Sequence, residues 1–245
     1  MSIPKTLLLA AALGGSGAWA QGPGFRGELG GMATQASALV QGASAQSSVL
    51  PYVYGDWGRF YGRVDTFGLR LRPLGQGHLE LATRLSTEGF EGRKTAYPAL
   101  GDRRSPTPVG LGTFQRTDLG GVFAYLMHDP RSGGQFAELN WAGQTRLGPV
   151  TLYPQLGLQY RSSAYVSHLY GVSSSASTAT GLRVWQPGAS WAPQLTLHAS
   201  LPLSGAWSLQ GQLRQRWFDG AVADSPLVQR SSQTSGLLAL TYTLH

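Results

Sequence analysis

The strongest constraint on this chain is an alternation of apolar and polar residues with a period of two. In QLTLHASLPL (194–203), three leucines and an alanine alternate with polar side chains. The pattern recurs in GHLELATRLS (77–86), VTLYPQLGLQYR (150–161), SLQGQLRQRW (208–217) and LLALTYTLH (237–245). Less regular strands are expected at 27–36, 47–56, 59–72, 109–115, 118–128 and 134–145. Successive side chains of a strand point to opposite faces, and helical periodicity is weak throughout, so the chain is predicted to be all-β.

The composition of the polar rows indicates which face of these strands is inside. In a soluble sandwich the leucines would cover a core, whereas in a membrane barrel they would face lipid and the polar row would line the lumen. The polar rows are rich in Gln, Thr, Ser and Arg, and beyond residue 20 the chain has a single lysine, Lys94. A soluble surface normally carries more Lys and Glu. The rows therefore favour a transmembrane antiparallel β-barrel.

The lengths of the connections and the positions of two tryptophans also favour a transmembrane barrel. Short connections such as RPLGQG and LPLSGAW alternate with long, Ser-rich ones at 162–190 and 218–235, as the turns and outer loops of a barrel do. Trp207 and Trp217 share the face of Leu209 and Leu213. A strand of that length, rising about 3.3 Å per residue and tilted by about 40°, spans about 25 Å, the height of the apolar band. The leucines of 194–203 are therefore predicted to face lipid.

The first twenty residues have the features of an export signal. MSIPKTLLLAAALGGSGAWA combines an early lysine, a short apolar run and a small-x-small cleavage site. We expect residues 1–20 to be a cleaved signal peptide and residues 21–245 to form one outer-membrane β-barrel domain. This places the protein in the cell outer membrane of a Gram-negative-type bacterium.

The basic charge suggests anionic neighbours in the cell envelope. The formal net charge is +7 at pH 7, the arginines are scattered along the chain, and there is no cysteine. Scattered arginines in an exported protein make nucleic acid a poor candidate partner. Anionic neighbours such as lipopolysaccharide, peptidoglycan and acidic solutes are better candidates, and outer-membrane lipid is the expected surrounding of the barrel.

The number of strands stays open between ten and twelve. Counting back from the C-terminus gives ten strands down to residue 47, and the segment 27–36 adds an eleventh. Bacterial single-chain barrels normally have an even number. Either the segment 21–46 lies partly outside the barrel, or residues 165–188 contain a further strand and the total is twelve.

The polar faces together predict a mildly basic lumen. The side chains placed there are Arg70, Arg72, Glu80, Arg84, Arg161, Arg214 and Arg216, with Glu138 on a strand whose inward face is unsettled. Open aqueous pores typically need about 16 strands. We therefore expect long side chains to cross the lumen and close it, with a weak anion preference in any opening.

No residue is assigned to catalysis, cofactor binding or metal binding. The histidines are scattered, and no two have the spacing of metal ligands. His128 and Asp129 could pair as hydrolase residues, but the following Pro and Gly residues favour a turn. GLGTFQ (110–115) lacks the third glycine and the helix of a phosphate-binding loop. The chain is predicted not to be an enzyme.

Long blocks of the sequence resemble the MipA/OmpV family of outer-membrane proteins, the MltA-interacting type. These blocks are LPYVYGDWGRFYGRVDTFGLRLRPLGQGHLEL (50–81), PTPVGLGTFQRTDLGGVFAYLMHDP (106–130), VTLYPQLGLQYRSSAYVSHLYGVS (150–173) and WSLQGQLRQRWFDGAVADSPLVQRSSQTSGLLALTYTL (207–244). The resemblance implies an outer-membrane barrel. It also implies a non-enzymatic scaffold between a murein lytic transglycosylase and a murein synthase. Other family members resemble adhesins or stress-response porins, so a narrow channel or an adhesin stays as the alternative function.

Overall fold

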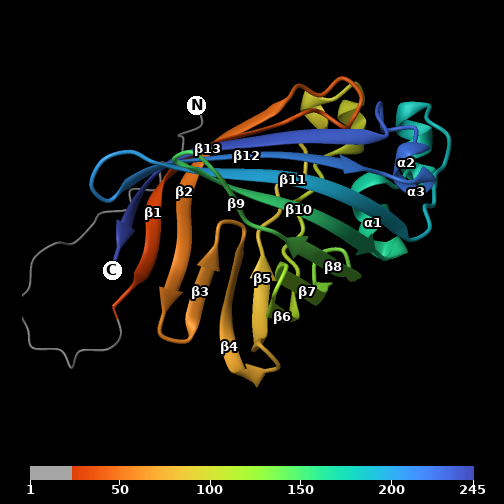
Figure 1. The fold of residues 1–245 in the computed structure, drawn as a ribbon. Helices are drawn as coiled ribbons and strands as arrows, with labels where there is room; N and C mark the ends of the chain where they lie inside the picture. Colours follow the sequence, from red (N-terminus) through yellow and green to blue (C-terminus); the bar gives the residue numbers. More distant parts are fainter. Residues whose placement is uncertain (1–23) are drawn as a thin grey trace, which may run out of the picture.

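A single antiparallel sheet closes on itself in this structure, a computed structural model that describes residues 24–245 (Figure 1). The expected signal peptide, residues 1–20, lies outside the described residues. The strands are β1 Arg26–Ala36, β2 Gln46–Trp57, β3 Phe60–Arg63, β4 Thr66–Leu74, β5 Gly77–Arg84, β6 Val109–Thr117, β7 Gly120–Asp129, β8 Gly134–Ala142, β9 Thr145–Leu147, β10 Val150–Arg161, β11 Ser190–Pro202, β12 Trp207–Trp217 and β13 Ser232–Leu244. Because β8 and β9 pair with successive parts of β10, they occupy one place in the wall, and the barrel has twelve strands.

The first and last strands close the barrel. Strand β13 pairs with β1 from Gly27 opposite Leu244 to Ala36 opposite Ser235. With β8 and β9 counted as one strand, every other pairing joins neighbours in sequence, so the connections are those of an up-and-down barrel. We call this β1–β13 pairing the seam.

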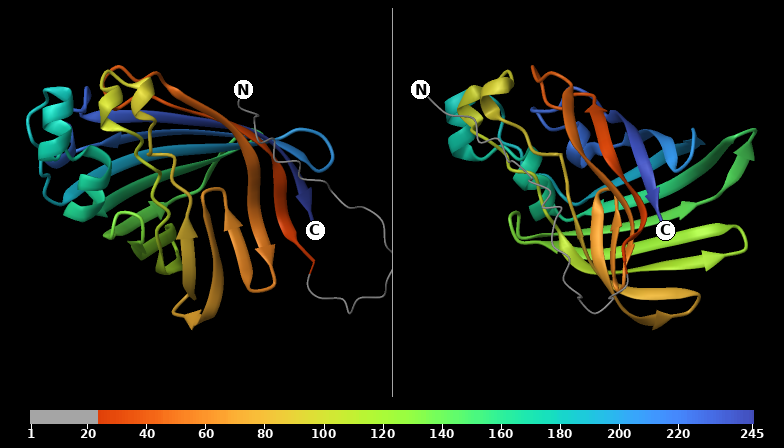
Figure 2. Two further views of the ribbon diagram at one scale, coloured as in Figure 1. Left: turned by 180° about the vertical axis from the view of Figure 1, so that it is seen from behind. Right: turned by 90° about the vertical axis from the view of Figure 1, so that its left-hand side faces the viewer.

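The two ends of the barrel differ in their connections. At one end, the turn end, the strands are joined by residues 58–59, 75–76, 118–119, 148–149 and 203–206. At the other, the loop end, lie the 3₁₀ helices η1 Gly92–Lys94 and η2 Pro98–Leu100 and the α-helices α1 Ser163–Tyr170, α2 Ser174–Thr180 and α3 Gly220–Ala223 (Figure 2). Short turns at one end and long loops at the other confirm the predicted arrangement. None of the helices within residues 24–245 has the length and apolar character needed to span a bilayer.

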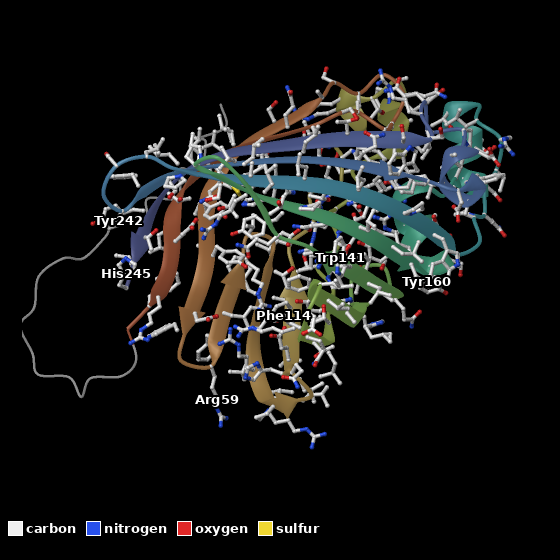
Figure 3. The ribbon with its side chains drawn as sticks, viewed as in Figure 1. Arg59, Phe114, Trp141, Tyr160, Tyr242 and His245 are labelled. Atoms are coloured by element: carbon white, nitrogen blue, oxygen red, sulfur yellow. The ribbon has the colours of Figure 1, made fainter. Side chains whose placement is uncertain are left out.

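The outward row is apolar, with aromatic side chains towards both ends. Trp207 and Trp217 end β12 on this face and are 44% and 43% exposed. Trp207 packs edge-to-face against Tyr242 near the turn end, and Trp191 packs at a tilt against Tyr160 near the loop end. Figure 3 labels the two tyrosines, Tyr242 and Tyr160, at these opposite ends. Between these belts, leucines such as Leu195, Leu197, Leu213 and Leu240 are exposed, as a lipid-facing surface requires.

The twelfth strand is not where the sequence suggested. The expected additional strand within 165–188 is wrong, because these residues contain α1 and α2. Instead, the single strand expected at 59–72 is a hairpin, β3 and β4, that turns at Val64 and Asp65. Strand β1 lies in the wall, and residues 37–45 connect it to β2 at the loop end.

Candidate functional site

The lumen contains a network of buried ion pairs. Arg84 on β5 lies 2.5 Å from Glu138 on β8, and Gln159 on β10 donates a second hydrogen bond to the same carboxylate. Arg63 on β3 lies 3.4 Å from Glu80, which is fully buried on β5. Buried charges are tolerated when each is paired and hydrogen-bonded. The network therefore links the inner faces of β3, β5, β8 and β10.

The carboxylate of Glu88, on a loop at the loop end, also belongs to this network. Glu88, in the connection between β5 and β6, lies 2.6 Å from Arg161 and also pairs with Arg216. Burial alone would raise the pKa of Glu88, but the two guanidinium groups outweigh it and hold its pKa below the ordinary value. Glu88 therefore stays ionised and fixes its loop to the inner wall.

Most of the predicted lumen row faces inward. The inward residues are Arg70, Glu80, Arg84, Glu138, Arg161, Arg214 and Arg216. The prediction for Arg72 is wrong. A bulge between Arg70 and Arg72 shifts the register, so Arg72 lies opposite Leu79 on the outward face near the turn end. A bulge adds one residue to a strand and reverses the faces beyond it.

Several inward charges were missed from sequence: Glu28, Asp56, Arg63, Glu88 and Arg116. Arg63 would have been found had the turn at Val64 and Asp65 been recognised. Asp56 pairs with Arg70 at 2.6 Å, and Glu28 accepts a hydrogen bond from Gln210 at 2.8 Å. Glu88 lies on a loop, where no alternation of apolar and polar residues predicts the direction of its side chain. The inward arginines slightly outnumber the inward acids, in keeping with the mildly basic lumen that was expected.

A cap of packed loops covers the loop end. It is built from residues 37–45, 85–108, 162–189 and 218–231. Arg103 donates to the carbonyls of His168 and Gly171, and Ser225 donates to the carbonyl of Tyr170 at 2.7 Å. These contacts join three of the loops, and the bridge between residues 40 and 228 adds the fourth.

The interior of this cap is apolar. Its fully buried side chains include Val166, Leu169, Val222 and Leu227. Around them lies a hydrophobic cluster that includes Tyr165 and Tyr170 of α1 and Tyr125 and Phe136 of the barrel wall. Burial raises the pKa of Tyr165 and of Tyr170 above the ordinary value, so both stay neutral. Packing of this kind stabilises a closed loop end.

Below the cap the lumen contains a cavity of about 780 Å³. It extends from Thr117 and Gln144 near the turn end to Gln35 and Gln46 near the loop end. This volume lies within the range of about 300–1,000 Å³ that is common for small-molecule sites. The ionic network therefore narrows the lumen without filling it.

The turn end carries a groove beside a free strand edge. Strand β9 separates from β8 at residues 143–144, and among the described residues it pairs only with β10. Its free edge borders a groove of about 690 Å³ lined by residues 117–120 and 144–146. Leu119 and Leu147 beside this groove are 79% and 70% exposed. We call this surface the turn-face groove.

The predicted turn at His128 and Asp129 is confirmed. The carboxylate of Asp129 accepts hydrogen bonds from the backbone N–H groups of Thr107 and Ser132, at 2.7 Å each. These bonds tie the β7–β8 turn to the start of β6. Within residues 24–245 there is no group of three His, Asp or Glu side chains that could hold a metal ion. The absence of catalytic, cofactor and metal residues stays a prediction.

A closed, twelve-stranded antiparallel barrel with an apolar outer band and aromatic belts defines the class: this is an outer-membrane β-barrel. A sequence model of the family described as "MltA-interacting protein MipA" matches residues 29–244. The chain therefore belongs to the MipA family, as its sequence blocks indicated.

Several known proteins are similar to this chain. The MltA-interacting protein of Escherichia coli K12 is 34% identical over 134 residues, which is 54% of each chain, so the match spans about half of that relative. The putative outer membrane protein YiaT of E. coli K12 is 24% identical over 78% of this chain and 80% of its own. The 24 kDa outer membrane protein of Pasteurella multocida is 22% identical over 86% and 88%. A solved anion-selective porin of Comamonas acidovorans is 11% identical over 90% of this chain, with a TM-score of 0.27.

Proposed function

We propose that this barrel is a non-enzymatic scaffold that docks a peptidoglycan-remodelling enzyme at its turn-face groove. In barrels of this class the short turns face the periplasm. A docking surface for a periplasmic enzyme therefore belongs at the turn end. The free edge of β9 beside the exposed Leu119 and Leu147 is the observation that carries the proposal.

The free edge and the leucines suit protein binding together. Unpaired N–H and C=O groups of an edge strand bind an extended segment of another chain by adding a strand. Exposed leucines next to such an edge supply the apolar contact area that a stable interface needs. Asp118 and Arg146 line the same groove and would orient a partner through charge.

The identity of the partner rests on the relative's name. A family member from E. coli is named for its interaction with MltA, and this chain is 34% identical to it over 134 residues. A murein lytic transglycosylase is therefore the first partner to test, and a murein synthase held by the same scaffold is the second.

A pull-down with the detergent-solubilised barrel tests this proposal. Wild type should retain a purified murein lytic transglycosylase, whereas Leu119→Asp should weaken binding by about tenfold, since it places a charge in an apolar contact. Val184→Asp is the matched control, because Val184 is an exposed apolar residue in the loop between β10 and β11. Equal retention by the wild type and the Leu119→Asp variant would refute docking at this groove.

A narrow channel is the second candidate function, and the cavity of about 780 Å³ favours it. The apolar cap counts against it, because ions would have to pass through a packed cluster that contains Val166 and Leu169. We therefore place the scaffold first and the channel second.

A further inference from the structure

The barrel wall has a window in its loop-end half. Strand β3 pairs with β2 only from Tyr54 to Trp57, which leaves residues 46–52 of β2 without a strand partner on that side. The β3–β4 turn forms the lower border, and residues 85–88 form the opposite side. The side chain of Gln46 donates to the carbonyl of Gly89 at 3.0 Å and closes the upper border. In Figure 1, β3 and β4 stop below the level that β2 reaches.

The lower border is anchored on both sides. The N–H of Val64 donates to Val53 on β2, and the carbonyl of Asp65 accepts from Leu85, at 2.8 Å each. A third bond, from the N–H of Asp65 to the carbonyl of Arg63, makes this a γ-turn. Val64 has φ of 61°, which is strained for a β-branched residue. These bonds hold the hairpin short and keep the window open.

The exposed edge of β2 is adapted to having no partner. Because Val53 directs its carbonyl to the β3 side, Pro51 and Val49 direct their backbone groups to the same side, into the window. A proline has no N–H to leave unpaired, and in sheets it occurs on free edges. The sequence of β2 is therefore suited to an edge that has no strand partner at the window.

The window leads into the cavity, whose wall is partly apolar and partly charged. Leu50, Val64 and Leu85 at the window border also line the cavity. One inner wall is apolar, where Met32, Tyr52 and Ala239 pack together with Val64 and Leu237. The arginines of the ionic network line the rest of the wall, and Arg214 on β12 lies beside β13, the strand that carries Leu237 and Ala239.

Two arginines that line the cavity, Arg116 and Arg214, form no ion pair among residues 24–245. Arg116 is exposed near the turn end, whereas Arg214 is half-buried. Arg84, Arg161 and Arg216 each pair with a carboxylate. Arg214 lines the cavity, and among residues 24–245 its side chain has one hydrogen bond, at 3.3 Å to the hydroxyl of Thr196. A guanidinium group has five N–H donors in a planar fork that matches a carboxylate or phosphate. Arg214 is therefore available to bind an anion inside the barrel.

We propose that the window admits a single-chain anionic amphiphile from the outer half of the membrane. The anionic head binds Arg214, and the hydrocarbon chain lies against the apolar wall of Met32, Tyr52 and Leu237 and leaves through the window. Free edges do not occur in lipid unless they line a cavity, so water or a polar head must meet the edge of β2. This binding is independent of the scaffold proposed above, because it uses the lumen and not the turn face.

Binding of radiolabelled palmitate tests the site. The protein is placed in nanodiscs of zwitterionic phosphatidylcholine, and retention is measured as the excess over empty nanodiscs. Wild type should bind saturably, and Arg214→Gln should lower the affinity by about tenfold or more, since the charged contact is lost. Arg131→Gln, an exposed arginine on the β7–β8 turn, should bind as wild type. Heat-dependent migration on gels shows that each variant is folded.

A blocked window tests the route. The chain has no cysteine, so Ser48→Cys, on the window side of the cavity, can be labelled uniquely with a bulky maleimide. Labelling should abolish palmitate retention, while labelling of Ser204→Cys in a turn-end connection should not. Full binding by labelled Ser48→Cys, or by Arg214→Gln, would overturn the proposal.

Competition identifies the head group. Displacement by oleate alone shows a site for free fatty carboxylates, and displacement by lysophosphatidylglycerol as well shows a site for anionic lipid heads. Both results support an anion bound at Arg214. Equal displacement by methyl oleate would contradict it, because the ester has no charge.

Discussion

At the scale of single residues, neighbours in sequence have opposite environments. Leu197 is 46% exposed and lies opposite Leu213, midway between the two aromatic ends of β12. Leu197→Arg would place a charge at the centre of the apolar band and should cost about 2–4 kcal/mol of folding stability. Urea titration of the barrel in phospholipid vesicles measures this cost.

The control for Leu197→Arg is an arginine substituted at a lumen-facing position. The adjacent inward residue, Thr196, is unsuitable, because it is 3% exposed and bonds to Arg214, so a second arginine there would be crowded and repelled. Gln212 lines the cavity, and Gln212→Arg should cost less than Leu197→Arg. Equal costs for the two variants would contradict the assignment of Leu197 to the lipid-facing side and of Gln212 to the lumen.

Period-two alternation predicts the direction of a residue only while the register is unbroken. It placed Arg84, Arg161 and Arg214 correctly in the lumen. It failed at Arg72, because the bulge after Arg70 leaves no mark in the pattern of apolar residues. Glu88 could not be placed at all, since its partner Arg161 lies on a distant strand and only the fold brings them together.

At the scale of elements, the clamp of Glu88 on Arg161 and Arg216 should hold the β5–β6 loop in the cap. Glu88→Gln removes the charge, so the loop should be cleaved faster by trypsin at Arg93, Lys94, Arg103 or Arg104. Glu91→Gln is the control, because Glu91 pairs with Arg93 and Lys94 on the exposed surface. Unchanged cleavage of Glu88→Gln relative to wild type would show that the clamp does not hold the loop.

The same clamp predicts a pH dependence. The pKa of Glu88 is lower in the folded protein than its ordinary value of 4.5. Its contribution to stability is therefore complete above the ordinary pKa and is lost as the pH falls through the folded pKa. The protection of the β5–β6 loop against hydrogen exchange, measured relative to the intrinsic exchange rate at each pH, should fall in acid. This fall should be absent in Glu88→Gln, in which protection is already low at neutral pH.

Strands were easier to predict than their ends. The alternating segments at 150–161 and 208–217 correspond closely to β10 and β12. The hairpin within 59–72 was missed because the γ-turn centred on Val64 contains no Gly, Pro or Asn, the residues that commonly predict a turn. The helices in 163–180 were missed because short helices in a Ser-rich loop depend on packing against the cap and not on periodicity.

At the scale of the whole molecule, the cap should keep the barrel closed to ions. We expect little or no steady conductance in planar bilayers, because the apolar cluster around Val166 and Leu169 covers the loop end. Rare openings should prefer anions weakly, since the acids nearly balance the arginines and Arg214 lacks an acidic partner. Large, stable, cation-selective currents would contradict the cap and the preference for a scaffold.

The seam has a consequence for biogenesis. Its pairs, such as Glu28 with Thr243, join residues from opposite ends of the chain, so they have the highest sequence separation in the barrel. Contacts between residues that are far apart in sequence form late, because the intervening chain must be ordered first. Until the seam closes, β1 and β13 are two long, unprotected edges that are prone to aggregate. These two edges therefore need to be shielded from other chains until β1 and β13 pair.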